Sequence, residues 1–459
     1  MPQIFNQPAL LKFSNISRGS ADISATFDGK NAQANIAINS LLTRTSSDVI
    51  DTLKAEVKSD LKSLFANLDI KSTRGESNAT INFDNVEKLE LKLTSKSLVL
   101  EDIMTLAGAF SNPTYIDQES LKSEKGKSQR IVKPTLDVLQ KEDSIAKKDT
   151  KAFWDIGKNI ALEAQIKKLT SKNSTMLEDF STKLSSTSTE LNLQHISGNV
   201  LSAKLDGSAK ITFDSARNIP YKFDTSSFSL KGLDASQIFA DKENPMLSGI
   251  FDATLKVEGA GNNTDHLLKY LCGEALINSQ SAGILRLLDK NSIAGRSTSI
   301  VGGVFKLTGR LLNNKVKELD GIGELISLFS KTDFQTAQIK LSRNSPDYNY
   351  NIDNVEIKTN SLILSSKSGK IFFDPNAQSF GDQKMNIPVV IYAKGSTKTL
   401  LEQIGYAKTK TENSEFYEGP TFYIQGTVSK PSNNLIDVLT STKRVIGNAL
   451  DKLNFFKKQ

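Results

Sequence analysis

The chain has 459 residues, of which 38% are hydrophobic and 24% charged, and its formal net charge is +7. This length favours two or three modules, or one elongated array, over a single hydrophobic core. Lysines alternate with acidic residues and serines, and no arginine-rich cluster with interleaved aromatic residues occurs, so we expect no nucleic-acid partner and interpret the charge as a solvated basic surface.

The N-terminal segment predicts an antiparallel hairpin. Apolar and polar residues alternate along ADISATF and again along AQANIAI, as in strands with one buried face. Asp28 and Gly29 lie between the two runs, and Asp-Gly suits the left-handed backbone of a tight turn. The pattern predicts that residues 1–110 form an N-terminal β module.

Two stretches, residues 81–110 and 211–240, align without a gap and share Phe83/Phe213 and Lys92/Lys222 among six identities. Such a repeat favours an architecture of stacked similar units. Residues 111–153 are polar and charged, which is typical of a linker or exposed coil. We therefore expect a second β module at residues 154–431.

Within this second module, Asp206 and Gly207 predict another hairpin turn, and four runs with a period of two predict strands at residues 251–259, 337–342, 348–352 and 421–428. Helical patterns begin after Thr264 as a possible N-cap, span residues 281–290 and 316–331, and run from Ser396 or Thr397 to Gly405. Residues 432–459 carry an apolar stripe with lysines around it, which predicts a C-terminal amphipathic helix.

The chain is poor in residues that carry chemistry. His195, His266 and the single Cys272 are far apart in the sequence and do not form a zinc pattern. Gly259–Ala260–Gly261 lacks the further glycine or the Gly-Lys-Ser/Thr of a phosphate-binding loop. We expect a non-enzymatic protein with no cofactor and no metal.

No run of 18 apolar residues occurs in the sequence, so it predicts no transmembrane helix. The segment MPQIFNQPALL lacks the basic and apolar regions of a signal peptide. A strand pattern begins almost at once, which would leave an unpaired sheet edge, so we expect a membrane anchor upstream of this sequence.

From Trp154 onward, WDIGKNIALEAQIKKL is followed by ISGNVLSAKLDGSAKITF, IPYKFDTSSFSLKGLDASQIF and LSGIFDATLKVEGAGNNTDHLLKYLCGEALI. The chain then continues through DNVEIKTNSLILSSKSGKIFFD, NIPVVIYAKGS and YIQGTVSKPSNNL. In their order these segments resemble the C-terminal part of the AsmA family of bacterial envelope proteins, which is related to the TamB and YhdP type of bridge-like lipid-transfer proteins. Residues 1–110 match only loosely, through the repeat.

The resemblance implies a mainly β protein with a few helices, whose long curved antiparallel sheet forms an apolar groove. It also implies a periplasmic location at the inner membrane, phospholipid or another acyl lipid as partner, and roles in phospholipid transport and outer-membrane biogenesis. Further envelope partners are implied but not identified.

The physical chemistry of such a sheet leads to a compatible expectation. About twenty strands spaced roughly 4.8 Å apart would extend on the order of 100 Å. Each acyl methylene removed from water contributes about 0.8 kcal/mol, so an acyl lipid is a suitable cover for a face that few helices can reach. The candidate groove residues are Ile23, Phe27, Ile36, Ile38, Phe251, Leu255, Val257, Ile339, Leu341 and Ile424.

The alternative is an array of β-sandwiches, in which two apolar sheet faces cover each other and the protein serves as a structural or binding module of the cell envelope. Its strands would show the same alternation.

Overall fold

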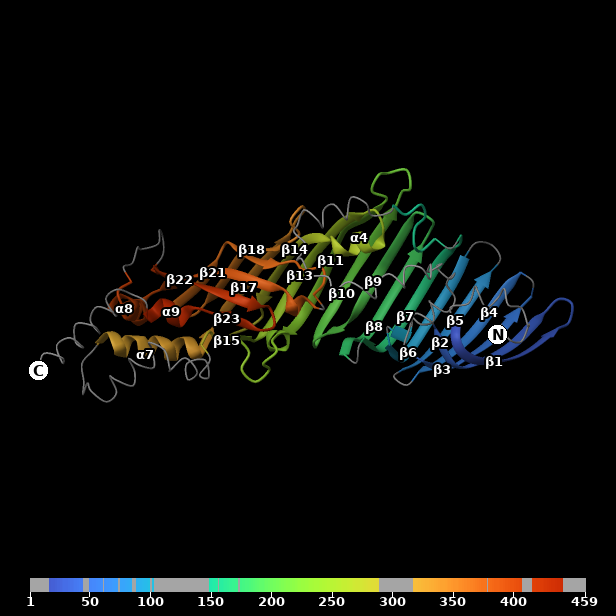
Figure 1. Cartoon of the computed structure of the whole chain (residues 1–459), viewed down its shortest axis with the longest axis horizontal. Helices are drawn as coiled ribbons and strands as arrows, with labels where there is room; N and C mark the ends of the chain where they lie inside the picture. Colours follow the sequence, from blue (N-terminus) through green and yellow to red (C-terminus); the bar gives the residue numbers. More distant parts are fainter. Residues whose placement is uncertain are drawn as a thin grey trace, which may run out of the picture. The chain divides into compact units, whose positions relative to one another are not determined.

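The computed structural model describes residues 16–43, 49–60, 62–72, 75–84, 88–99, 101–102, 148–155, 157–171, 174–288, 317–377, 379–406 and 415–440. Within these residues the chain is mainly β, with twenty strands in a mixed sheet and three in a smaller sheet (Figure 1). The prediction of a mainly β protein with a long sheet and a few helices is confirmed. The chain divides into two compact units, of which the first contains Met1–Val200, Leu205–Ser226 and Glu258–Tyr270.

The strands of the first unit follow one another across the sheet in chain order. They are β1 (Ile16–Phe27), β2 (Ala32–Thr43), β3 (Ile50–Ser59), β4 (Ser63–Ser72), β5 (Glu76–Asp84), β6 (Lys88–Val99), β7 (Asn159–Ser171), β8 (Ser174–Ser186), β9 (Glu190–Val200) and β10 (Ala203–Phe213). The short helix α4 (Thr264–Lys269) also belongs to this unit.

One pair of strands departs from the expected antiparallel sheet. The β6–β7 pair is parallel, with Lys88 opposite Asn159 and Val99 opposite Thr170, so the sheet is mixed. Parallel neighbours need a crossover connection, which the chain between Val99 and Asn159 is long enough to supply. The proposed linker at residues 111–153 lies largely outside the described residues, and the module boundaries stay a prediction.

The first hairpin turn has the predicted position. Gly29 adopts φ = 90°, and the Asp28 carboxylate accepts hydrogen bonds from the backbone N–H groups of Lys30 (2.9 Å) and Asn31 (2.6 Å). The bonds from Asn31 are the main cause that lowers the pKa of Asp28 to about 2. The β3–β4 turn repeats this arrangement, because the Asp60 carboxylate accepts from the N–H groups of Lys62 and Ser63.

The second predicted turn was wrong. Asp206 and Gly207 lie inside β10, and the chain instead turns at Leu201 and Ser202, where φ is 48° and 68°. The aligned stretches at residues 81–110 and 211–240 each start near the end of one strand, at Ile81 in β5 and Ile211 in β10.

Within the described ranges, the second unit combines strands with three α-helices and two short 3-10 helices. Its elements are η1 (Ala235–Ile238), β12 (Leu247–Ser248), β14 (Cys272–Ser279), β15 (Gly283–Leu285), α7 (Lys317–Ser330), β16 (Thr332–Phe334), β17 (Thr336–Arg343), β18 (Tyr350–Lys358), β19 (Leu362–Ser366), β20 (Gly369–Phe372), η2 (Phe380–Asp382), β21 (Lys384–Ala393), α8 (Gly395–Gln403), β22 (Tyr417–Thr427), β23 (Pro431–Asn433) and α9 (Leu435–Thr440). Strands β11 (Tyr221–Asp234) and β13 (Ile250–Gly261) contribute residues to both units, and so does β10, whose Ala203 and Lys204 belong to the second unit.

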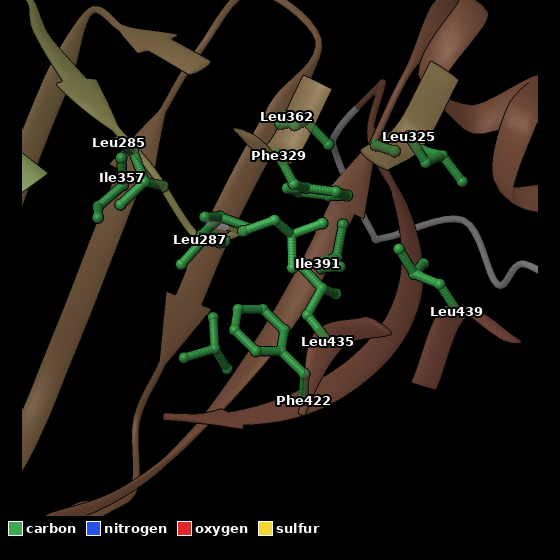
Figure 2. Packing of buried hydrophobic residues seen from close by; sticks show 14 of the residues in the cluster. Leu285, Leu287, Leu325, Phe329, Ile357, Leu362, Ile391, Phe422, Leu435 and Leu439 are labelled. Carbon is green, nitrogen blue, oxygen red and sulfur yellow. The ribbon is translucent and has the colours of Figure 1, made fainter. Parts of the chain in front are cut away.

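Helices and strands of the second unit enclose one hydrophobic core. Leu325 of α7, Leu401 of α8 and Leu435 of α9 are each 0% exposed and belong to one cluster with the strand residues Ile391 and Phe422. Figure 2 shows the side chains of Ile391, Phe422 and Leu435 converging. The three helices therefore close the apolar face of these strands.

The helix predictions had mixed outcomes. The pattern at residues 316–331 corresponds to α7, and α8 begins at Gly395, one residue before the expected cap. The first turn of α4 is capped by the Asn263 side chain rather than by Thr264, because Asn263 accepts from the N–H of His266 (2.8 Å). Residues 283–285, expected within a helix, form β15 and pair with β12 and β16. Of the proposed C-terminal helix only α9 is described; residues 441–459 lie outside the described part.

Candidate functional site

The sheet of the first unit has two chemically different faces. Residues that pair across neighbouring strands share a face, so the register traces rows that run across the sheet. The central apolar row is Ile23, Ile36, Ala55, Leu68, Ala79, Leu93, Ala164, Thr182 and Ile196. The next row on this face is Ala25, Ala34, Val57, Ala66, Ile81, Leu91, Leu162, Leu184 and Leu193. We call the surface that these rows form across β1–β9 the apolar face.

The opposite face is polar along the same strands. The row between the two apolar rows is Ser24, Asn35, Glu56, Asn67, Thr80, Lys92, Glu163, Lys183 and His195. Lysines and glutamates on neighbouring strands pair here, as Lys183 does with Glu163 (3.6 Å). The alternation in the sequence therefore produces a sheet with one solvated face and one apolar face.

The apolar face is only partly covered. Ile23 is 51% exposed and Phe27 is 64% exposed, whereas Leu53 and Ala55 of β3 are buried. Among the described residues, no helix of the first unit makes an extensive contact with β1–β9. The three-stranded sheet of β12, β15 and β16 belongs to the second unit, so the described first unit also lacks the second sheet that a β-sandwich requires. The first unit thus differs from the second, where α7, α8 and α9 close the core.

At β10 and β11 the protein supplies its own cover. We call the segment 148–155 the strap. Its Trp154 ring centroid lies 5.9 Å from that of Tyr221, and the Tyr221 centroid lies 4.8 Å from that of Phe213. The Trp154 indole donates to the carbonyl of Thr187 (2.8 Å), and the Tyr221 hydroxyl donates to the Asp149 carboxylate (3.0 Å). Burial is the main cause that raises the pKa of Tyr221. The strap therefore fills the space beside Phe213 with aromatic side chains.

A hollow of about 1080 Å³ lies over β1–β5. Its lining combines the central apolar row with the polar rows on both sides, including Asp22, Lys54 and Asp69. The volume is at the upper end of the range for small-molecule sites. Because polar and apolar residues both line it, this hollow is not a purely apolar pocket and differs from the apolar face itself.

The sequence-predicted groove residues fall into three groups. Ile23, Phe27, Ile36 and Ile38 come together on the apolar face of the first unit. The residues Leu255, Val257, Ile339 and Leu341 are half-buried in strands of the second unit. Phe251 (1% exposed) belongs to the closed core of that unit, and Ile424 packs against it.

Sequence reasoning missed much of the apolar face, including Leu68, Leu91 and Leu93. The signal was present in KLELKLTS, where leucines alternate with charged residues at residues 88–95.

The isolated reactive residues do not come together in a site. His195 is exposed, with Nδ1 4.0 Å from the Asp206 carboxylate. His266 lies in the first turn of α4 and packs against Tyr270, with ring centroids 4.7 Å apart and ring planes inclined at 52°. Within the described ranges, no group of three or more His, Cys, Asp or Glu residues could hold a metal ion.

None of the helices in the described part of the chain has the length and hydropathy needed to cross a membrane.

Comparison with protein families gives a match to the AsmA family over residues 13–319. The matched range includes β1–β15 and therefore the whole apolar face. The strands β16–β23, in which the resemblance to the family was also noted, lie beyond it. No curated protein and no solved structure matches the chain.

Proposed function

The chain belongs to the AsmA family of the bacterial envelope, and we propose that it holds phospholipid acyl chains on the apolar face of its first unit and so supports phospholipid transport and outer-membrane biogenesis. We place this activity in the periplasm, at the inner membrane. The AsmA family is not a known family of enzymes, which agrees with a role in binding rather than catalysis.

A single observation carries the proposal: two neighbouring rows across β1–β9 are apolar at every position except Thr182, and no described helix of the first unit covers them. The second unit has the same alternation of apolar and polar residues, but three helices close its core. An apolar face of this extent is unfavourable in water, since each buried Å² contributes roughly 25 cal/mol. Acyl chains can cover this apolar face and remove it from water, because they bring no polar group that requires a hydrogen-bond partner.

The geometry of the face suits an acyl chain. On β1 the apolar positions Ala21, Ile23, Ala25 and Phe27 are two residues apart, or roughly 6.6 Å each, so four rows extend about 20 Å along the strands. An extended acyl chain has a comparable length. A chain of sixteen carbons, at about 0.8 kcal/mol per methylene, would gain on the order of 12 kcal/mol from full removal from water.

The direct test is to purify the protein without detergent, extract it with organic solvent and quantify phospholipid by mass spectrometry. We expect phospholipid in at least equimolar amount. Leu68→Asp places a carboxylate in the central apolar row and should abolish retention, whereas Asn67→Asp on the polar face is the matched control and should retain it. Wild-type protein that is folded but free of lipid would contradict the proposal.

A further inference from the structure

Strand β1 is an edge of the sheet within the described part of the first unit, because it pairs there with β2 alone. The ladder is regular from Ser20, opposite Asn39, to Phe27, opposite Ala32. On the apolar face of β1, Ile23 is 51% exposed and Phe27 is 64% exposed, whereas the partner of Ile23 on β2 is half-buried. The described residues thus leave one side of β1 open.

The ladder also determines which backbone groups of β1 point away from β2. The N–H of Asp28 donates to the carbonyl of Asn31 (3.1 Å), so residue 28 directs its backbone groups toward β2. This direction alternates along an antiparallel strand, and no register shift interrupts residues 20–27. The even-numbered residues therefore bond to β2, and residues 21, 23, 25 and 27 direct both N–H and C=O toward the open side.

The open side of β1 lacks the usual protection of a sheet edge. Unprotected edges pair readily with other strands, and proteins commonly blunt them with lysines, prolines, bulges or very short strands. From Ser20 to Phe27 the strand contains neither lysine nor proline, Asp22 is its one charged residue, and its register shifts all lie before Ser20. By contrast, β23 has three residues and begins with Pro431. The edge of β1 is therefore suited to strand pairing.

This edge is complementary to a second copy of itself. If two β1 strands lie antiparallel with Ser24 opposite Ser24, Ile23 pairs with Ala25 and Ala21 pairs with Phe27. Each large apolar side chain then lies opposite a small one.

The polar face and the backbone favour the same register. Asp22 lies opposite Thr26, so no like charges oppose each other directly between residues 21 and 27. A shift by one residue would place apolar residues opposite polar ones. Among the remaining registers, this one alone gives a partner to all four outward-directed residues within the regular part of β1.

We propose that two copies of this chain associate through an antiparallel β1–β1 ladder centred on Ser24, which joins their sheets into one. Residues directly opposite each other in a ladder share a face, so the apolar faces of the two copies become continuous. The arrangement has the two-fold symmetry that is most common among identical subunits. The ladder depends on the edge of β1 and is present whether or not lipid is bound.

The first test is disulfide cross-linking of the full chain with Cys272→Ser, so that the introduced thiol is the only one. Ser24→Cys places it at the two-fold axis, where opposing Cα atoms lie roughly 4.5 Å apart, within the range of a disulfide. The matched control is Asn35→Cys, which is also exposed and lies opposite Ser24 on β2. Its two copies would be separated by three strand spacings, or roughly 14 Å.

We expect mild oxidation to link Ser24→Cys into dimers at least about tenfold more efficiently than Asn35→Cys, as measured on non-reducing gels. Equal cross-linking of the two variants would indicate random collision and overturn the proposal, as would the absence of cross-linking in both.

The second test removes one hydrogen bond from the open side. Ala25→Pro deletes an outward-directed N–H and leaves the bonds to β2 in place, whereas the control Ala25→Ser keeps the N–H. Sedimentation equilibrium without detergent should show a dimer for the wild type and the control, and a dissociation constant at least about tenfold higher for Ala25→Pro. Circular dichroism checks the fold of each variant, and the cross-linking comparison decides if Ala25→Pro is unfolded.

The same samples separate this inference from the proposed function. A wild type that is monomeric at about 100 μM, or a folded Ala25→Pro that dimerises as the wild type does, would overturn the β1–β1 ladder. Phospholipid bound to a monomer would leave the proposed function intact, and a dimer without lipid would leave the ladder intact and contradict the proposed function.

Discussion

Truncating one phenylalanine in each unit distinguishes a face covered by protein from one left open. Phe422 is 0% exposed in the closed core, so Phe422→Ala should cost about 3–5 kcal/mol, the usual range for a fully buried phenylalanine. Phe27 is 64% exposed, so folding removes only about 36% of its accessible surface from water. At roughly 3 kcal/mol for full burial, Phe27→Ala should cost about 1 kcal/mol in delipidated protein.

Hydrogen exchange followed by mass spectrometry measures both effects locally, because peptides from β21–β22 and from β1–β2 report the opening free energy of each region separately. The effects on retained phospholipid should have the opposite order from the effects on stability. Phe27→Ala should reduce retained phospholipid, and Phe422→Ala should leave it unchanged if the second unit stays folded. A cost above about 3 kcal/mol for Phe27→Ala in delipidated protein would refute the reasoning, since it would mean that protein atoms cover this face.

Three further outcomes can be checked. Leu255→Asp, on the apolar side of β13 in the second unit, should lower the melting temperature and leave retained lipid unchanged, whereas Lys256→Asp on the exposed side should change neither; mass spectrometry and melting temperature measured together check both outcomes. The folded pKa of Asp28 is about 2 and its unfolded value 3.8, so its stabilising contribution is present above pH 3.8 and is lost as the pH falls through 2; Asp28→Asn should flatten the pH dependence of stability in this interval. Burial raises the pKa of Tyr406 to about 12, and its hydroxyl donates to the Val438 carbonyl (2.6 Å). The neutral phenol should therefore stabilise the fold fully below pH 10, and this contribution to stability should disappear as the pH rises through 12. Tyr406→Phe should lower the free energy of unfolding by about 1 kcal/mol, as measured by urea denaturation.

The two Asp-Gly pairs illustrate which information the sequence contains. Across Asp28–Gly29 the apolar positions change from odd to even numbers, as they must when the chain reverses and Phe27 pairs with Ala32. Across Asp206–Gly207 they stay odd, at residues 203, 205, 209, 211 and 213, so a single strand continues through the pair. The phase of the alternation agrees with both outcomes, whereas the turn propensity on which the prediction rested was right only for the first.

Other features could not be read from local pattern. Residues 281–290 contain apolar residues at helical spacing, but Gly283–Leu285 pairs with β12 and β16, so tertiary pairing decided the structure of a short segment that is ambiguous in isolation. The exposure of Ile23 and Phe27 among the described residues of the first unit was equally hidden, because the same alternation occurs in β21 and β22, where helices cover the face. Which apolar face stays open depends on where the helices pack.

The parallel junction between β6 and β7 has a consequence for how the first unit folds. The antiparallel neighbours within β1–β6 and within β7–β9 are joined by short turns, so each meander consists of contacts that are close in sequence. Lys88 and Asn159, in contrast, pair across 159 − 88 = 71 positions. Since closing a longer loop costs more conformational entropy and slows folding, we expect the two meanders to form first and the β6–β7 ladder to form last. Folding would then be limited by the joining of two preformed half-sheets, each of which exposes an unpaired edge strand until the ladder closes.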